Sequence, residues 1–271
     1  MHTRDRFMDH GERIPMENPT IQLMNARCST RVYTDEPITA EEKRAILHTT
    51  MRAPTAGNLM LYSIIEVDDQ ALKDRLAVTC DDQPFISKAP WVLVFLADFQ
   101  KWMDLFAASD VASLEDCGHR DAPRAGDLML ACSDALIAAQ NAVIAAESLG
   151  IGSCYIGDIL ERAEEHCELL ELPQHVLPIA MLCFGRPASQ RPLTPRLEEH
   201  VVMRDHYVRL TPAQLQETAD EMQRQHAPHG LPDGITHYPQ TIYKRKFMSE
   251  YMEEMNRSVD WWLKRWQTPE E

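Results

Sequence analysis

The longest regular pattern in the sequence is an alanine-rich stretch over residues 127–149. Its core, ALIAAQNAVIAAESLG, is apolar nearly all round, and Gly150 is suited to ending a helix at this point. A helix that is apolar on every side is buried, and small side chains let a second helix approach closely. We therefore expect this helix to lie at the centre of the molecule or at the centre of a dimer.

Shorter helices and strands are predicted on both sides of this helix. Helix starts are indicated by Asn18-Pro19, by a capping box that begins at Thr39, and by Thr211-Pro212. The predicted helices cover 18–27, 39–51, 69–78, 127–149, 158–170, a segment from 211, and 242–266. The predicted strands cover 62–67, 91–97, 153–156 and 176–184. Helices alternating with about four strands predict an α+β or α/β sandwich with a central helix layer.

Two further segments have a distinctive composition. Residues 99–126 are rich in acidic residues, Gly and Pro, and we expect an irregular lid or surface excursion there. The helix over 242–266 carries an aromatic stripe at helical spacing. The stripe consists of Tyr243, Phe247, Tyr251, Met255, Val259, Trp262 and Trp266. We expect it to pack on the body or on a second subunit; the alternative is stacking at a ligand site.

The overall charge limits the classes of partner. The formal net charge is -15 at pH 7, so neither a nucleic acid nor an anionic membrane surface is expected to bind. An anionic ligand would need a local cluster of basic residues. Arg27 and Arg31 form such a cluster.

Cysteine usage and hydropathy indicate the compartment. The seven cysteines include no CxxC pair, which favours a reducing compartment. The first residues lack the apolar segment of a signal peptide, and the longest apolar run, 91–97, is too short to span a membrane. No HExxH motif or Cys/His ligand set indicates a metal site. We expect a cytoplasmic protein without a metal centre.

Two short motifs carry groups suited to a cofactor. The RCSTR segment (27–31) has two arginines and two hydroxyls where a predicted helix ends, and the APTAGN loop (53–58) puts the Asn58 amide in a tight turn. Arginine pairs with phosphate through two hydrogen bonds, and an amide can both donate to and accept from a heterocycle. Together they indicate a phosphorylated cofactor with a ring. The alternative is a helix C-terminus with arginines on its last carbonyls, followed by a plain turn.

Five motifs in order resemble the FMN-dependent nitroreductase family. They are RCSTR, APTAGN, Lys88-Ala89-Pro90 before a buried strand, AAESLGIGSCYIGD after the long helix, and FGRP followed by Pro195-Arg196. The resemblance implies an α+β fold, namely a three-layer sandwich with a small, mostly antiparallel sheet, long central helices and a helical C-terminal extension. It also implies a homodimer with FMN at the interface.

The same resemblance divides the chain into three parts. Residues 1–17 form a polar N-terminal arm, 18–200 form the FMN-binding domain, and 201–271 form a helical extension that packs on the body or the partner subunit. This extension is longer than that of compact family members, and it leaves the substrate pocket unspecified.

The resemblance assigns cofactor-binding roles to four segments. The positions that hold the FMN phosphate and ribityl chain are matched by Arg27, Cys28, Ser29 and Arg31. The loop that meets the flavin ring is matched by Pro54, Thr55 and Asn58. The segment whose backbone amides face flavin N5 and O4 is matched by Tyr155, Ile156, Gly157 and Asp158. The basic residue that closes on the phosphate is matched by Arg196, with Arg186 and Arg191 as competitors.

Two departures from the family pattern affect cofactor affinity. Cys28 stands where a second basic residue is frequent, which weakens the expected phosphate binding. Leu59-Met60 stands where an amide often follows the asparagine, so one ring contact is expected to be lost.

The activity implied by the resemblance is that of an FMN-dependent oxidoreductase. Hydride passes from NAD(P)H through flavin N5 to an electron-poor acceptor such as a nitroaromatic or a quinone. No catalytic side chain is required, because the cofactor carries the chemistry and the protein supplies orientation and electrostatics; Trp102 and Phe106 are candidates for the substrate-side wall. The alternatives are reductive dehalogenation or other flavin chemistry on the same fold, and a flavin-binding module without turnover.

Overall fold

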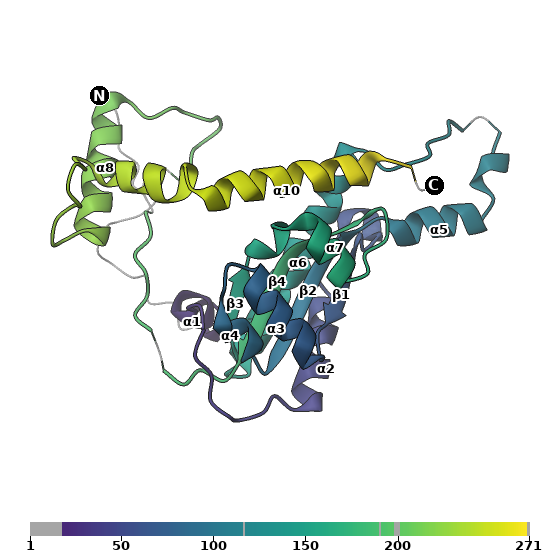
Figure 1. The fold of residues 1–271 in the computed structure, drawn as a ribbon, viewed down its shortest axis with the longest axis horizontal. Helices are drawn as coiled ribbons and strands as arrows, with labels where there is room; N and C mark the ends of the chain where they lie inside the picture. The colour runs from purple at the N-terminus through teal and green to yellow at the C-terminus, as the bar shows by residue number, and fades with distance from the viewer. Residues whose placement is uncertain (1–17, 116, 190, 198–200, 270–271) are drawn as a thin grey trace.

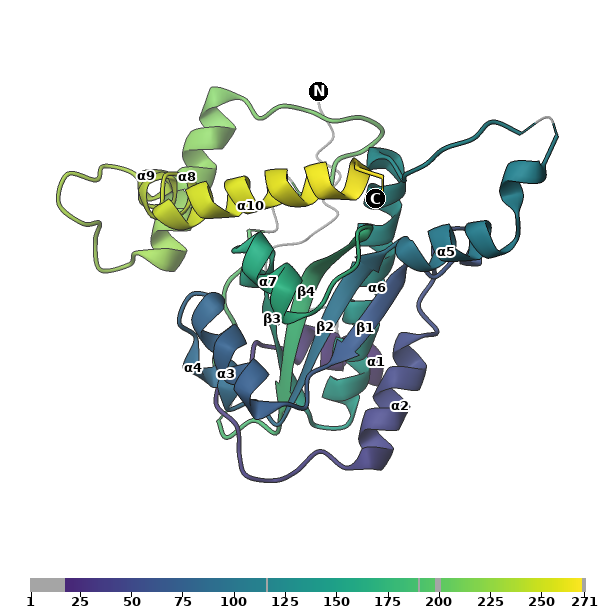
Figure 2. The same ribbon diagram turned by 45° about the vertical axis from the view of Figure 1, so that its right-hand side comes forward.

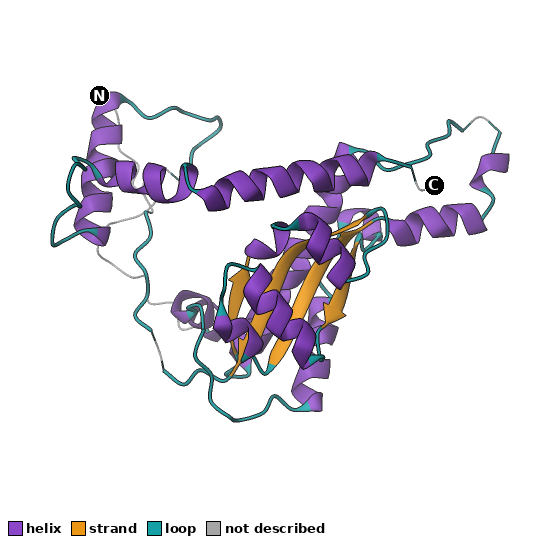
Figure 3. Cartoon of the chain, in the orientation of Figure 1, coloured by secondary structure: helices purple, strands orange, loops and turns teal. Residues whose placement is uncertain are grey.

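The computed structural model describes residues 18–115, 117–189, 191–197 and 201–269. The polar arm predicted over 1–17 lies outside the described residues. Within them, a four-stranded sheet forms the centre of the fold, and helices lie on both of its faces (Figures 1 and 3).

The sheet is antiparallel, with the strand order β1-β2-β4-β3. Its strands are β1 (Tyr62–Glu66), β2 (Trp91–Asp98), β3 (Gly152–Ile156) and β4 (Val176–Gly185). Every residue of β2 is buried, as its continuous apolar run predicts. The position of β3 at an edge leaves one of its sides available to another segment of the chain.

Two helical layers enclose the sheet (Figure 2). One layer contains α2 (Ala40–Thr50) and α6 (Ala125–Ser148), and the other contains α3 (Gln70–Thr79), α4 (Pro84–Ser87) and α7 (Ala163–Leu169). Helix α10 (Glu250–Gln267) crosses one end of the sheet and contacts both α7 and α6. Alternate side chains of β2 enter different cores. Leu93 and Phe95 pack with α2 and α6, whereas Val92 and Val94 pack with the other layer. The predicted three-layer α+β sandwich is confirmed.

Helix α6 buries one face against the sheet. The buried face consists largely of alanines, including Ala135, Ala138, Ala139, Ala142 and Ala146. The opposite face exposes Met129, Leu130, Leu136 and Ile137, which are 67%, 49%, 43% and 40% exposed. Helix α6 is therefore not buried on every side within one chain. Of the two expected positions, the centre of the molecule and the centre of a dimer, the exposed apolar face favours the second. Among the described helices, only α6 is long and apolar enough to cross a membrane, and its contacts with all four strands identify it as a core helix.

The predicted helix starts are confirmed by their caps. The Asn18 side chain accepts hydrogen bonds from the first turn of α1 (Pro19–Ala26), and Thr39 and Glu42 form the predicted capping box of α2. Thr211 forms another with Gln214 at the start of α8 (Pro212–His226). Local sequence therefore determines where these helices begin.

Three of the predicted elements need correction. Residues 99–126 are not irregular throughout, because α5 (Gln100–Ala108) and the short η2 (Val111–Ser113) lie within them. The acidic, Gly and Pro-rich composition belongs to the part after α5, whereas the α5 sequence has ordinary helical residues. In Figure 1, α5 extends away from the sheet.

The predicted helix over 158–170 is broken into η3 (Asp158–Leu160) and α7. The break falls at Arg162, whose φ of 45° is left-handed. The N–H of Arg162 donates to Glu254 on α10 at 3.0 Å. The backbone N–H at the break therefore finds its acceptor on a residue far away in the sequence, and local patterns do not reveal this contact.

The predicted helix over 242–266 is also divided. It consists of α9 (Tyr238–Ile242), a π-helical turn η4 (Tyr243–Phe247) and α10. The new start has its own cap, because the Ser249 hydroxyl accepts from the N–H of Met252 at 3.3 Å.

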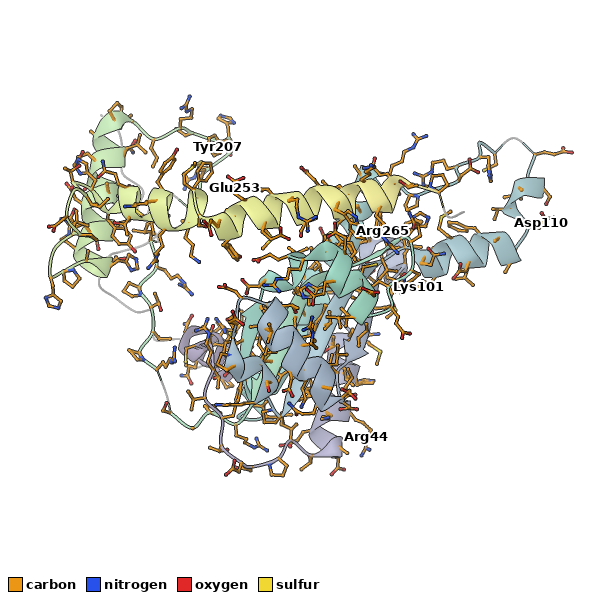
Figure 4. All side chains as sticks on the ribbon, viewed as in Figure 1. Arg44, Lys101, Asp110, Tyr207, Glu253 and Arg265 are labelled. Atoms are coloured by element: carbon orange, nitrogen blue, oxygen red, sulfur yellow. The ribbon has the colours of Figure 1, made fainter. Side chains whose placement is uncertain are left out.

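The C-terminal half of the aromatic stripe packs on the body, as expected. Trp262 and Trp266 are buried, and the Trp262 Nε1 donates to the carbonyl of Leu160 at 3.1 Å. Arg265, labelled in Figure 4, lies on α10, and its guanidinium donates to three carbonyls of the turn between α7 and β4. The other half differs, because Tyr243 is exposed on η4 and stacks on Phe247.

Candidate functional site

The RCSTR segment lies along the available edge of β3. The N–H of Thr30 donates to the carbonyl of Ser153 at 2.9 Å, and Ser29 forms a parallel bridge with the same residue. A β-carbon at Gly152 would lie 2.1 Å from the Thr30 Oγ1. Glycine is therefore required at this position, because the Thr30 side chain occupies the space that a β-carbon would need.

Two arginines give this edge its positive charge. In the described part of the chain, neither Arg27 nor Arg31 forms an ion pair with a carboxylate, whereas other arginines such as Arg186 and Arg257 do. The Cζ of Arg31 lies 5.6 Å from the ring centroid of Phe85. Two arginines outside the ion pairs of the described residues, with the Glu147 carboxyl near Arg27, give this edge a local positive charge in a chain of net charge -15.

The remaining residues of the RCSTR segment lie close to β3. Burial raises the pKa of the Cys154 thiol, while the Arg31 charge and hydrogen bonds with Ser29 and Arg31 oppose the rise. Cys28 is half-buried and free. The alternative reading, in which arginines hold the last carbonyls of α1, finds no such side-chain bond among the described residues; the C-cap contact is the Arg27 backbone N–H on Leu23.

The three competing arginines after β4 differ in their surroundings. Arg186 pairs with Glu42 at 2.6 Å and with Glu36 at 2.8 Å, and it also donates to the carbonyl of Leu149. Its positive charge is therefore already neutralised. Arg191 and Arg196 are exposed, in a stretch without regular secondary structure.

The APTAGN loop is held by a buried carboxylate of α6. Asp134 is 2% exposed, and it accepts hydrogen bonds from the Thr55 hydroxyl, the Ala56 N–H at 2.9 Å and the Leu61 N–H at 3.1 Å. The Thr55 hydroxyl also accepts from the N–H of Met60 at 2.9 Å. The loop is therefore fixed to the central helix by its threonine.

The tip of this loop is exposed. Pro54 and Asn58 are exposed, and Asn58 has a φ of 60°. Asparagine tolerates this left-handed conformation better than most residues. The asparagine amide is thus displayed on a loop whose backbone is fixed by Asp134.

Sequence reasoning did not assign a role to Asp134. The available signal was the position of Asp134 within the apolar, alanine-rich part of the helix, away from the acidic residues near its two ends, because a buried charge requires partners. The donors that satisfy it come from a loop more than seventy residues earlier, which the sequence alone does not reveal.

The segment after β3 turns out of the sheet into η3. Ile156 is buried, whereas Gly157 is exposed and a β-carbon there would have no atom within 4 Å. The Tyr155 hydroxyl lies 3.4 Å from the Gln140 Oε1 on the exposed side of α6. The carboxylate of Asp158 accepts from Gln83 Nε2 at 2.9 Å. The exposed glycine leaves room for a ligand to approach the backbone.

Electrostatics link this segment to the arginines. Burial raises the pKa of Tyr155 to about 12, and the Arg27 charge partly offsets that rise. Burial likewise raises the pKa of Glu147 near the end of α6, again opposed by Arg27. The RCSTR segment, β3 and the last turns of α6 therefore form one neighbourhood.

The APTAGN loop lies at a different level of α6. It is attached at Asp134, whereas Arg27 lies near Glu147. The two acidic residues are thirteen positions apart on one helix, which corresponds to about 20 Å at 1.5 Å per residue. Within one chain, the structure brings the RCSTR segment and β3 together, but it does not bring the APTAGN loop to them.

The fold and this arrangement define a class of flavin-dependent oxidoreductases. The profile of the nitroreductase family matches residues 24–186, and the chain belongs to that family. It is an enzyme of the NAD(P)H-dependent FMN reductase and nitroreductase group.

Particular relatives support this assignment. The chain is 33% identical over 189 residues to an oxygen-insensitive NADPH nitroreductase of Salmonella typhimurium, covering 70% of this chain and 74% of the relative. It is 34% identical over 185 residues to a Bacillus subtilis FMN reductase that uses NAD(P)H, covering 68% and 72%. Among solved structures, the Vibrio harveyi NADPH:FMN oxidoreductase complexed with NAD+ matches with a TM-score of 0.75 and 26% identity, covering 91% of this chain and 98% of that one.

Proposed function

We propose that this protein binds FMN and uses NAD(P)H to reduce electron-poor acceptors such as nitroaromatics and quinones. The observation that carries the proposal is the pair of arginines, Arg27 and Arg31, without carboxylate partners at the β3 edge of a nitroreductase fold. Relatives named as an NADPH nitroreductase and an FMN reductase support the same reaction class.

The donor set fits a flavin mononucleotide. Arg27, Arg31 and the Ser29 hydroxyl supply the charged and neutral donors that a phosphate monoester requires. The Asn58 amide offers both a donor and an acceptor to the polar edge of a flavin ring. Backbone N–H groups at Gly157 and Asp158 suit the other edge of the ring, since glycine allows a close approach.

A second copy of the chain completes the site in this proposal. The exposed apolar face of α6 suits pairing with the same face of another copy. If two α6 helices pair antiparallel, the turn of α6 that carries Asp134 in one copy lies close to the turn that carries Glu147 in the other. The APTAGN loop of one copy then lies near the RCSTR segment of its partner, which overcomes the separation of about 20 Å along one helix.

The protein's own groups bind and orient in this reaction. Bound FMN supplies hydride transfer between NAD(P)H and the acceptor. Arg27 and Arg31 hold the phosphate, and the Gly157 and Asp158 amides stabilise negative charge at the ring edge. No nucleophilic side chain is needed.

All seven cysteines are free, which is consistent with the cytoplasm as the compartment.

An absorption spectrum tests this proposal. Purified protein should show flavin bands that bleach when NADPH or NADH is added without oxygen. Bands that neither donor bleaches would favour a flavin-binding module without turnover. An absence of bound flavin even after FMN is added would mean that the chain shares the fold of the family but not its cofactor site. Turnover of a halogenated phenol but not of nitroaromatics would favour reductive dehalogenation over the proposed reaction.

The shared site has its own test. Ile137→Glu places a charge on the exposed face of α6, where it faces solvent in a single chain. The proposal expects a folded monomer that retains little FMN, measured by gel filtration and flavin absorbance. A monomer with full flavin content would contradict a site built from two chains.

A further inference from the structure

Helix α4 touches both ends of the proposed flavin site. Its Phe85 ring lies beside the RCSTR segment, with its centroid 5.6 Å from the Arg31 Cζ. Gln83, the N-cap residue of α4, donates through Nε2 to Asp158 at 2.9 Å and to the carbonyl of Cys80 at 2.8 Å. One short helix therefore contacts both the phosphate-side arginine and the ring-edge acid.

Phe85 is held more firmly than the arginine beside it. The Phe85 ring is half-buried and packs against the core below α3 and α4, and the next residue, Ile86, is fully buried. Arg31 is exposed and, within the described residues, forms no ion pair. The restraints on its side chain are the Phe85 ring and the thiol of Cys154.

We propose that Phe85 is a positioning residue that holds Arg31 in place for the phosphate of FMN, and that it thereby sets the preference for FMN over riboflavin. This inference rests on the proposed function. A long side chain loses rotamer freedom when it binds a phosphate. An arginine already held over an aromatic face has lost part of that freedom before the ligand arrives.

A cation–π contact of this kind leaves N–H donors of the guanidinium available to a ligand. The flat face of a guanidinium stacks on an aromatic ring, while its N–H donors point outward in the guanidinium plane. Arg31 can therefore contact Phe85 and a phosphate at the same time. Phe85 acts on the ligand only through Arg31, so its effect should vanish for a flavin that has no phosphate.

Two flavins and matched variants test the inference. Apo-protein is titrated with FMN and with riboflavin, and binding is followed by flavin fluorescence. Phe85→Leu should weaken FMN binding about two- to tenfold, the range expected from the cost of ordering one rotamer-rich side chain when the ligand binds, and leave riboflavin binding unchanged. Phe85→Tyr should keep the wild-type ratio of the two dissociation constants. Phe247→Leu, which removes an exposed aromatic that stacks on Tyr243, is the control and should change neither constant.

A double variant makes the test specific to the pair. In an Arg31→Ala background, Phe85→Leu should have no further effect on FMN binding, because the group that Phe85 positions is absent. Equal weakening of FMN and riboflavin by Phe85→Leu, or an undiminished effect without Arg31, would overturn the inference. Wild-type protein that binds riboflavin as tightly as FMN would instead overturn the proposed phosphate site itself.

Discussion

Asp134 is the side chain whose replacement should be most informative about the APTAGN loop. Its Oδ1 accepts from the Ala56 N–H at 2.9 Å, and its Oδ2 accepts from the Leu61 N–H at 3.1 Å and from the Thr55 hydroxyl. In Asp134→Asn the side chain keeps its shape but has one acceptor oxygen. If that oxygen takes the position of Oδ2, the new amide N–H₂ faces the Ala56 N–H, and two donors oppose each other in a buried place.

The expected cost follows from these contacts. Losing one hydrogen bond to a charged acceptor and leaving a buried donor unpaired costs about 2–3 kcal/mol. In a protein of this size that lowers the melting temperature by roughly 4–10 °C. Because the loop is then less firmly fixed, FMN affinity should also fall.

Urea and thermal denaturation followed by circular dichroism measure the change. Asp220→Asn is the matched control, since Asp220 is exposed on α8 and accepts from Gln216 at 2.9 Å. The control should shift the free energy of unfolding by no more than about 0.5 kcal/mol. An Asp134→Asn protein as stable as the Asp220→Asn protein would refute the assignment of Asp134 as the anchor of the loop.

Three further predictions concern the surroundings of the site. Gly152→Ala places a β-carbon against Thr30, 2.1 Å from its Oγ1. It should lower the free energy of unfolding, measured by thermal denaturation, by about 1–3 kcal/mol and weaken FMN binding. An unchanged free energy of unfolding and FMN affinity would show that the RCSTR segment is not closely held. Glu147→Gln removes a partly buried carboxyl beside Arg27, whose pKa burial raises, and it should tighten FMN binding because no negative charge then opposes the phosphate at this edge. An unchanged FMN dissociation constant would argue against this charge. Burial and neighbouring acids raise the pKa of Glu161 from 4.5 to about 7. Its contribution to the free energy of unfolding is therefore full below pH 4.5 and is lost as the pH rises through about 7, by about 3 kcal/mol. Glu161→Gln should flatten the pH dependence of urea denaturation, and an unaltered slope would contradict this.

Local patterns predicted the elements whose boundaries are set by their own residues. The Thr39 capping box, the apolar run of β2 and the alanine-rich α6 each satisfy their requirements locally, and all are found in the structure. The break at Arg162 was not predicted, because its N–H is satisfied by Glu254 from α10. Such tertiary contacts override local propensity.

The same division holds for the candidate site. The sequence indicates which residue types suit a phosphate and a ring, and the structure brings the RCSTR segment to β3 through Thr30 and Ser153. The role of Asp134 and the contact between Arg31 and the Phe85 ring could not be predicted, since each joins segments that meet only in the folded chain. The cofactor-binding roles of the RCSTR segment, the APTAGN loop, Tyr155–Asp158 and Arg196 remain predictions.

The flavin content of Arg27→Ala/Arg31→Ala protein tests the central claim most directly. Arg44→Ala/Arg245→Ala removes the same charge from exposed positions on α2 and η4, and serves as the control. The account predicts that the control binds FMN stoichiometrically, whereas the Arg27→Ala/Arg31→Ala protein is folded and colourless even after FMN is added. Stoichiometric flavin in the latter protein would contradict the assignment of the β3 edge as the phosphate site.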